Sequence, residues 1–338
     1  MVKQSDIAKA AGFSLSVVSR ALSHTKGKND TLSDDTRRQV REIARKMGYT
    51  PNYHASCLRK GRVPIIGVFL PTWTGYLLCE LLMGMSKAAN ECGFPLDIYF
   101  DMSIEAYSRF IDSMNEQGNS GIISYVPKFN DDKIDPKIFT KMASYRKNGG
   151  KIVFLNAMNV DLGDIPTVSV DEEHGGMLAG EHLCSKKCGD YYGLHSSGGL
   201  YLWRIKGFVD SIKRRDARAD VHAVAMPNCG IGDEYDFLRN PDGEIWGRAE
   251  ERPIGIFCTA DIITRHVIHY AQRNGFVPGK DFHVVSYDRD AMGREPLEYP
   301  RIIQPFFDIG HQGVLTLLNM IKGGNEASKI LKPVLQAT

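Results

Sequence analysis

The chain has 338 residues, of which 43% are hydrophobic and 24% charged, as in soluble globular proteins of two or three domains. Its longest apolar runs, such as residues 65–70, are too short to span a bilayer, and the N-terminus lacks the apolar stretch of a secretory signal. The seven cysteines are scattered and odd in number, which favours reduced thiols over a disulfide framework. We therefore expect a cytoplasmic protein without a membrane partner.

Charge is distributed unevenly along the chain. Residues 1–62 carry 13 Lys or Arg against five acids, a net charge of +8, while the whole chain has +2 and the remainder therefore −6. A small basic head on an acidic body is the electrostatic pattern of a nucleic-acid-binding module joined to another domain.

The basic head contains a predicted helix-turn-helix. Residues 4–11 form an amphipathic helix, which Gly12 ends by supplying a left-handed turn. After a short turn, Ser14 or Ser16 can cap a second helix, SLSVVSRAL. Two short helices joined in this way are the helix-turn-helix pattern. A third helix is predicted from Ser33, a good N-cap, to Gly48.

Four segments follow one another in a specific order: DIAKAAGFSLSVVSRAL, DDTRRQVREIARKMGYTPN, ASCLRKG and IIGVFLP. This series resembles the head of the lactose-repressor (LacI/GalR) family of transcriptional regulators, and the resemblance continues through nearly the whole chain. It implies a helix-turn-helix DNA-binding domain at 1–49, a hinge helix and linker at 50–63, and a two-lobed effector-binding and dimerisation domain at 64–338.

The resemblance assigns the second helix to the major groove of DNA. Leu15 and Ser16 match the family's two main base-reading positions, and Arg20 matches a third. Arginine can pair bidentately with guanine, serine can offer a weak hydrogen bond, and leucine can contact a thymine methyl. The candidates for phosphate contacts are Ser14, Ser19, Ser33 and Thr36. Helix capping is an equally good interpretation of Ser14 and Ser33.

In the family, the hinge becomes helical on operator DNA, and a paired leucine wedges into the minor groove. Leu58 matches that leucine, and Asn52 and Ala55 match positions that face the groove floor. An ordinary linker leucine is the alternative for Leu58.

The head departs from the family in its loop 23–31, which is about four residues longer than usual and carries Lys26 and Lys28. These lysines can add phosphate contacts, or the loop can be a bystander. Val17 also replaces a usual threonine.

From Ile65 onward, apolar strand-like runs alternate with amphipathic helices, and the second half repeats the pattern of the first. The expected fold is an all-α helix-turn-helix head with an α/β, two-lobed, periplasmic-binding-protein-like body built on parallel sheets. Ligands of such sheets bind at the carboxyl ends of the strands, so we expect an effector between the two lobes.

Arg204, Asp261 and Asp288 match effector-contacting positions of the family, although Ala260 replaces the asparagine that usually precedes the first aspartate. Asp261 can instead cap the following helix. The remaining candidates at strand ends or helix starts are Trp73, Tyr76, Tyr125, Asp171 and Trp203. Aromatic rings with a few charged groups suit a sugar, although each ring alone is more often packing within a lobe than stacking on a ligand.

No cofactor or metal is predicted. Cys184 and Cys188 are spaced to share one face of a helix, but without further ligands this spacing favours packing. No nucleotide-binding or nucleophile motif occurs at a strand–helix junction, which disfavours an enzyme. A transport-type sugar-binding protein would share the body but lack the basic head.

We therefore predict a DNA-binding transcriptional repressor rather than an enzyme. Its expected partners are double-stranded operator DNA, a small-molecule effector such as a sugar or sugar derivative, and a second copy of the chain. The sequence does not distinguish a homodimer from a higher oligomer. Whether the effector releases DNA or promotes binding depends on which conformational state it prefers. The final KPVLQAT is either a clipped strand or a short natural end.

Overall fold

The computed structural model describes residues 2–22, 32–49, 63–72, 75–125, 134–157, 162–196, 199–226, 244–247, 252–289 and 298–337. The predicted hinge residues Asn52, Ala55 and Leu58, the loop 23–31 and Trp73 lie outside these ranges. The chain divides into two compact units. The first comprises Met1–Thr72, Met85–Thr167 and His311–Ser328, and the second Trp73–Gly84, Val168–Gly310 and Lys329–Thr338.

The head is a three-helix domain of α1 (Gln4–Ala11), α2 (Leu15–Leu22) and α3 (Asp34–Lys46). Gly12 ends α1 in the left-handed conformation, with φ at 70°, as the sequence predicts. One apolar face from each helix meets in a small core of five buried residues, which are Ile7, Val18, Ala21, Val40 and Ala44. The predicted order of three helices is therefore what the structure contains.

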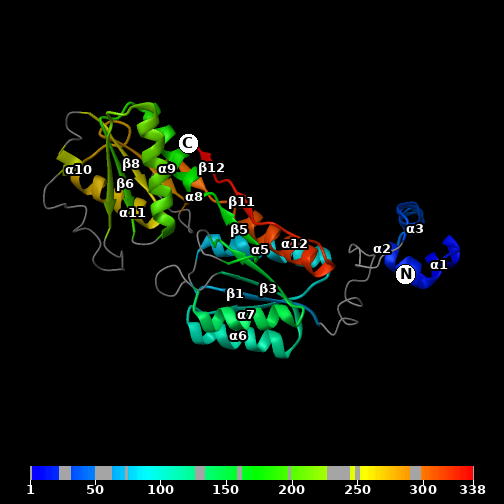
Figure 1. Ribbon diagram of the computed structural model, residues 1–338. Helices are drawn as coiled ribbons and strands as arrows, with labels where there is room; N and C mark the ends of the chain where they lie inside the picture. The colour runs from blue at the N-terminus through cyan, green and yellow to red at the C-terminus, as the bar shows by residue number, and fades with distance from the viewer. Residues whose placement is uncertain are drawn as a thin grey trace. The chain divides into compact units, whose positions relative to one another are not determined.

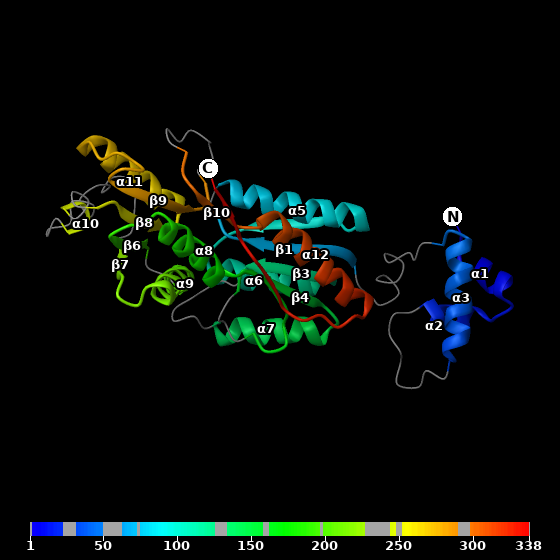
Figure 2. The same ribbon diagram turned by 90° about the horizontal axis from the view of Figure 1, so that it is seen from above.

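The first sheet has the strand order β11-β5-β4-β3-β1-β2. Its strands are β1 (Val63–Leu70), β2 (Leu96–Phe100), β3 (Asn119–Tyr125), β4 (Lys151–Leu155), β5 (Thr167–Val170) and β11 (Lys329–Leu331). The helices beside it are α5 (Tyr76–Cys92), α6 (Ile104–Glu116), α7 (Pro136–Lys147) and α12 (Phe306–Lys322). In Figures 1 and 2, α6 and α7 cover one face of the sheet, and α5 and α12 lie along the other.

The second sheet has the strand order β12-β10-β9-β8-β6-β7. Its strands are β6 (Asp190–His195), β7 (Asp220–Ala225), β8 (Ile254–Cys258), β9 (Phe282–Tyr287), β10 (Arg301–Ile303) and β12 (Val334–Gln336). The associated helices are α8 (Glu172–Ser185), α9 (Gly199–Arg215), α10 (Glu244–Gly247) and α11 (Asp261–Asn274). Helices α8 and α9 lie on one side of this sheet and α11 on the other (Figure 2). β12 runs antiparallel to β10, whereas β6 to β10 pair in parallel.

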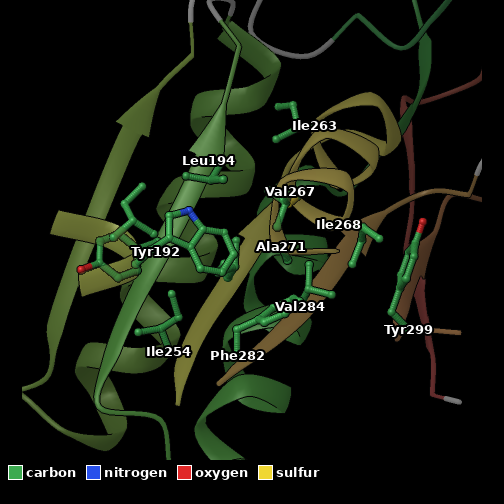
Figure 3. Packing of buried hydrophobic residues seen from close by; sticks show 14 of the residues in the cluster. Tyr192, Leu194, Ile254, Ile263, Val267, Ile268, Ala271, Phe282, Val284 and Tyr299 are labelled. Carbon is green, nitrogen blue, oxygen red and sulfur yellow. The ribbon is translucent and has the colours of Figure 1, made fainter. Parts of the chain in front are cut away.

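The α11 side of the second sheet is a continuous apolar core (Figure 3). Val267 and Ala271 of α11 point toward Leu194, Val284 and neighbouring strand residues. Alternate residues of the same strands face the α8–α9 side, because side chains in a strand alternate between its faces. The buried sheet holds the carboxyl ends of its strands in fixed positions, where the polar groups described below lie.

Helices α8 and α9 pack so closely that their backbones are in contact. A Cβ added at Gly207 would lie 1.9 Å from the carbonyl oxygen of Glu173, and one at Gly176 would lie 1.8 Å from that of Arg204. Only glycine fits at such crossings. The close approach fixes the position of Arg204 on α9 relative to the first turn of α8.

The fold class is confirmed, with one correction in the details. The sequence places Cys184 and Cys188 on one helix, but α8 ends at Ser185 and Lys187 has a left-handed φ of 57°, so Cys188 follows the helix. The C-terminal segment supplies one strand to each sheet, β11 and β12.

Candidate functional site

The second helix of the head presents the predicted DNA-reading residues to solvent. Leu15 is 54% exposed, and Ser16 and Arg20 are exposed as well, while Val18 and Ala21 of the same helix are fully buried. An exposed leucine on a helix whose Val18 and Ala21 are fully buried is available for contact with a partner. The predicted phosphate contacts Ser14, Ser19 and Ser33 are also exposed, and Thr36 is half-buried.

Serine side chains organise the starts of α2 and α3. The Ser14 hydroxyl accepts a hydrogen bond from the Val17 amide at 3.3 Å and lies 2.9 Å from the Ser16 hydroxyl. The Ser33 hydroxyl accepts from the Thr36 amide at 3.2 Å, which makes it the N-cap of α3. The capping interpretation of these serines is confirmed, and a phosphate contact by the same hydroxyls stays a prediction.

A buried polar network in the second unit contains the predicted effector residue Arg204. The Arg204 side chain is 6% exposed, and its Nε donates to Glu172 Oε2 at 2.7 Å. Its Nη2 donates to Glu172 Oε1 at 3.1 Å, and its Nη1 donates to the carbonyl oxygen of Thr259 at 2.6 Å. The guanidinium is thus held in a bidentate ion pair inside the protein.

An aromatic ring completes the surroundings of this ion pair. The guanidinium carbon of Arg204 lies 3.6 Å from the ring centroid of Tyr287, a cation–π arrangement, and the Tyr287 hydroxyl donates to Glu172 Oε2 at 2.7 Å. Burial is the largest single effect and lowers the pKa of Arg204, but Glu172, Tyr287 and Asp288 together outweigh burial, so the pKa of Arg204 is raised. Burial and the Glu172 charge also raise the pKa of Tyr287 well above its ordinary value. Tyr287 therefore acts here as a neutral hydrogen-bond donor.

Asp288 lies next to this network and is linked to it through Gln304. The Gln304 side-chain amide donates to Asp288 Oδ2, while Arg204 Nη2 lies 3.4 Å from Gln304 Oε1. The Tyr76 hydroxyl donates to Asp288 Oδ1 at 2.8 Å. Burial raises the pKa of Asp288 to about 6, although Arg204 and the hydrogen bonds oppose the shift. The structure therefore brings together three predicted effector residues, Tyr76, Arg204 and Asp288.

These groups meet at the carboxyl ends of parallel strands in the second sheet. Thr259 follows β8, Asp288 follows β9 and Gln304 follows β10. Asp288 has a left-handed φ of 68°, a conformation that aspartate tolerates better than most residues. Carboxyl ends of parallel strands are where α/β sheets bind ligands.

Four further predicted effector residues lie in the described part of the chain. The Asp171 side chain caps α8 by accepting from the His174 amide at 2.9 Å. Asp261 is the first residue of α11 and lies 4.0 Å from Arg265. Trp203 is a half-buried residue of α9, and Tyr125 ends β3 of the first sheet. Their effector contacts stay predictions.

Sequence reasoning did not identify Glu172, Thr259, Tyr287 or Gln304. Glu172 and Tyr287 are direct neighbours of the predicted residues Asp171 and Asp288, so the rule that polar residues at strand ends form sites pointed to the right segments. The sequence carries no signal that the Glu172 carboxylate reaches Arg204, because that contact depends on the packing of α8 against α9.

The described residues offer a hydrogen-bonding site rather than a metal centre. Among them, no group of three or more His, Cys, Asp or Glu side chains is placed to hold a metal ion. None of the described helices is both long enough and apolar enough to cross a membrane. The network combines two tyrosine hydroxyl donors, one glutamine amide, two carboxylates and one guanidinium, groups that recognise ligands through directed hydrogen bonds.

A helix-turn-helix head on an α/β body with two mostly parallel sheets is the architecture of DNA-binding transcription regulators with a periplasmic-binding-protein-like body. Comparison with known proteins agrees. The family model "Bacterial regulatory proteins, lacI family" matches residues 4–52. The head of the chain, residues 4–52, is therefore similar to the head of the lacI family of bacterial regulatory proteins.

Similar proteins extend the match over the body. The transcriptional regulator RegA of Clostridium saccharobutylicum is 21% identical over 94% of this chain and 91% of its own length. The ribose operon repressor of Bacillus subtilis is 25% identical over the same shares of the two chains. Two solved structures share the fold. A regulator CelR–cellobiose complex matches with a TM-score of 0.64 and 18% identity over 100% of this chain and 99% of the other. The Lac repressor dimer bound to operator matches with a TM-score of 0.60 and 20% identity, over 99% of this chain and 97% of the other.

Proposed function

We propose that this regulator is a repressor that reads a two-fold symmetric operator as a homodimer and whose operator affinity is set by a sugar or sugar derivative. The observation that supports DNA binding is the solvent-exposed face of α2, where Leu15, Ser16 and Arg20 lie outside the core of the head. A two-fold dimer would present two such helices to two half-sites.

The buried network at the carboxyl ends of the second sheet supports the effector half. It supplies the polar groups that orient a hydroxyl-rich ligand, at the place where α/β sheets bind ligands. The solved relative with cellobiose and the relative named a ribose operon repressor make sugars the first class to examine. Because effector and operator act on one equilibrium, each changes the affinity for the other by the same factor.

Three measurements test the proposal with the full-length protein. Selection from random duplex DNA should yield a palindromic sequence, and sedimentation of the selected complex should give two protein chains per duplex. A thermal-shift screen of sugars, sugar acids and purines should then find a ligand that raises the unfolding midpoint and changes operator affinity. Failure to select any sequence would refute the DNA-binding half, and a ligand that leaves operator affinity unchanged would refute the coupling.

The hinge prediction has its own experiment. Replacement of Leu58 by alanine should weaken operator binding, because a wedge into the minor groove is lost, while ligand-induced thermal stabilisation stays intact. Equal operator affinity of the two proteins would exclude the wedge.

A further inference from the structure

The carboxyl end of α2 is held by two arginines of the neighbouring helix. Arg37 Nη1 donates to the carbonyl oxygen of Arg20 at 3.1 Å, and Arg41 Nε donates to that of Ala21 at 3.0 Å. The last four carbonyls of a helix have no partner within the helix and must bind something else. Here α3 supplies donors to two consecutive carbonyls in the last turn of α2.

The placement of Arg37 is unusual for its residue type. Arg37 is only 6% exposed, in a domain whose core consists of five buried apolar residues. Arginine is rarely buried unless its guanidinium is bound. A cation at the carboxyl end of a helix also complements the helix dipole. Both arginines therefore interact with α2 through charge as well as through hydrogen bonds.

The same turn of α2 carries the predicted base-reading arginine. The backbone carbonyl oxygen of Arg20 accepts a hydrogen bond from Arg37. The Arg20 side chain is exposed, and its Nε donates to the carbonyl oxygen of Ser16 at 3.4 Å. Bidentate pairing with guanine requires a guanidinium in a defined position and plane. A small rotation of the last turn of α2 would displace that group relative to the base edges.

We propose that Arg37 and Arg41 are positioning residues for DNA reading, which fix the last turn of α2 and thereby aim the Arg20 guanidinium at its base. This inference rests on the proposed function, because it presupposes that α2 reads DNA. It assigns to α3 a part in sequence discrimination that is separate from any contact between α3 and the phosphates.

The test compares full-length Arg41→Met with a matched control, Arg38→Met. Arg38 lies on the same helix and its side chain is 79% exposed in an ion pair with Asp35, so its replacement removes the same charge without touching α2. Each protein is titrated with the duplex selected by the wild type and with a scrambled duplex. We expect Arg41→Met to lose about tenfold or more of the preference for the selected duplex. Arg38→Met should weaken binding to both duplexes by equal factors.

A double-mutant cycle separates positioning from simple destabilisation. In an Arg20→Met background, Arg41→Met should cause no further loss of preference, since the group that it positions is gone. Arg41→Lys, which keeps a donor near the Ala21 carbonyl, should restore part of the preference. Arg37→Lys provides the same comparison at the buried position, where truncation to methionine can unfold the head.

Three outcomes would overturn the inference. One is equal preference in Arg41→Met and Arg38→Met, and another is an undiminished effect of Arg41→Met without Arg20. The third is a fall of about 0.9 in the slope of log affinity against log salt for Arg41→Met but not for Arg38→Met, which would assign Arg41 to a phosphate. If the wild type selects no sequence at all, the proposed function fails instead, and that result is distinguishable from all three.

Discussion

Replacing Arg204 by methionine should strongly destabilise the second unit. The side chains of Arg204 and Glu172 are 6% and 3% exposed, and their ion pair is 2.7 Å long. Removing one partner of a buried pair leaves a buried charge without compensation, which costs about 3–5 kcal/mol of unfolding free energy. Replacing both residues by methionine should cost less than Arg204→Met alone, since no charge is left behind.

The same pair of helices offers an exposed control. Lys206 on α9 pairs with Glu173 on α8 at 2.6 Å, but these side chains are 50% and 40% exposed. Surface pairs contribute about 0–1 kcal/mol, so Lys206→Met should change the unfolding free energy by no more than that. The two ion pairs have similar lengths and differ mainly in burial.

Urea denaturation followed by tryptophan fluorescence, in a protein whose Trp73 and Trp203 are replaced by phenylalanine so that Trp246 alone emits, measures these differences. Trp246 packs against Phe276 at a ring-centroid distance of 4.5 Å in the core of the second unit, so its emission reports unfolding there. A loss below about 1 kcal/mol in Arg204→Met, equal to that in Lys206→Met, would refute the reasoning from burial. A double variant that loses the sum of both single losses would show that the two residues are not coupled.

Three further predictions concern pH, close packing and capping. Burial raises the pKa of Asp288 to about 6, above about 3.9 for an unfolded chain, so its stabilising contribution is present below about pH 4 and lost as pH rises through about 6. Relative to Asp288→Asn, the wild type should lose up to about 3 kcal/mol between pH 4 and 8 in urea titrations, and parallel pH profiles would contradict this. Gly207→Ala should cost about 1–3 kcal/mol or more, because the added Cβ would collide with the Glu173 carbonyl, and an unchanged melting midpoint would exclude the backbone contact. Ser33→Ala should cost about 0.5–2 kcal/mol through loss of the N-cap, whereas Ser33→Asp should keep most of the head's stability by circular dichroism.

The head was the part most fully predictable from the sequence. Its helix boundaries are set by short-range signals, namely Gly12 after α1 and Ser33 before α3, which act within a few residues of where they stand. The burial of Val18 and Ala21 agrees with the helical periodicity of the second helix. The exposure of Leu15 does not follow from periodicity, because a residue three positions before Val18 lies on the same face; the family resemblance was what assigned Leu15 to a DNA-reading position. The contact of Arg37 with α2 spans 17 residues and has no such periodic signal.

The effector candidates were predictable as positions but not as interactions. Strand-end reasoning and the family resemblance pointed to Arg204 and Asp288, and the structure brings both into one network. Neither approach indicated that Glu172 binds Arg204, because the pairing requires the close approach of α8 and α9 at Gly176 and Gly207. Such contacts depend on packing between elements that are far apart in the sequence, and local sequence patterns carry no information about that packing.

The C-terminal segment has a consequence for the order of events during synthesis. β11 is an edge strand of the first sheet and β12 an edge strand of the second, and both lie within residues 329–336. Neither sheet can be completed until residues 329–336 have left the ribosome, although most of the first sheet is synthesised much earlier. A nascent or prematurely terminated chain would therefore expose an unpaired strand edge in both halves at once, and such edges are sites of aggregation.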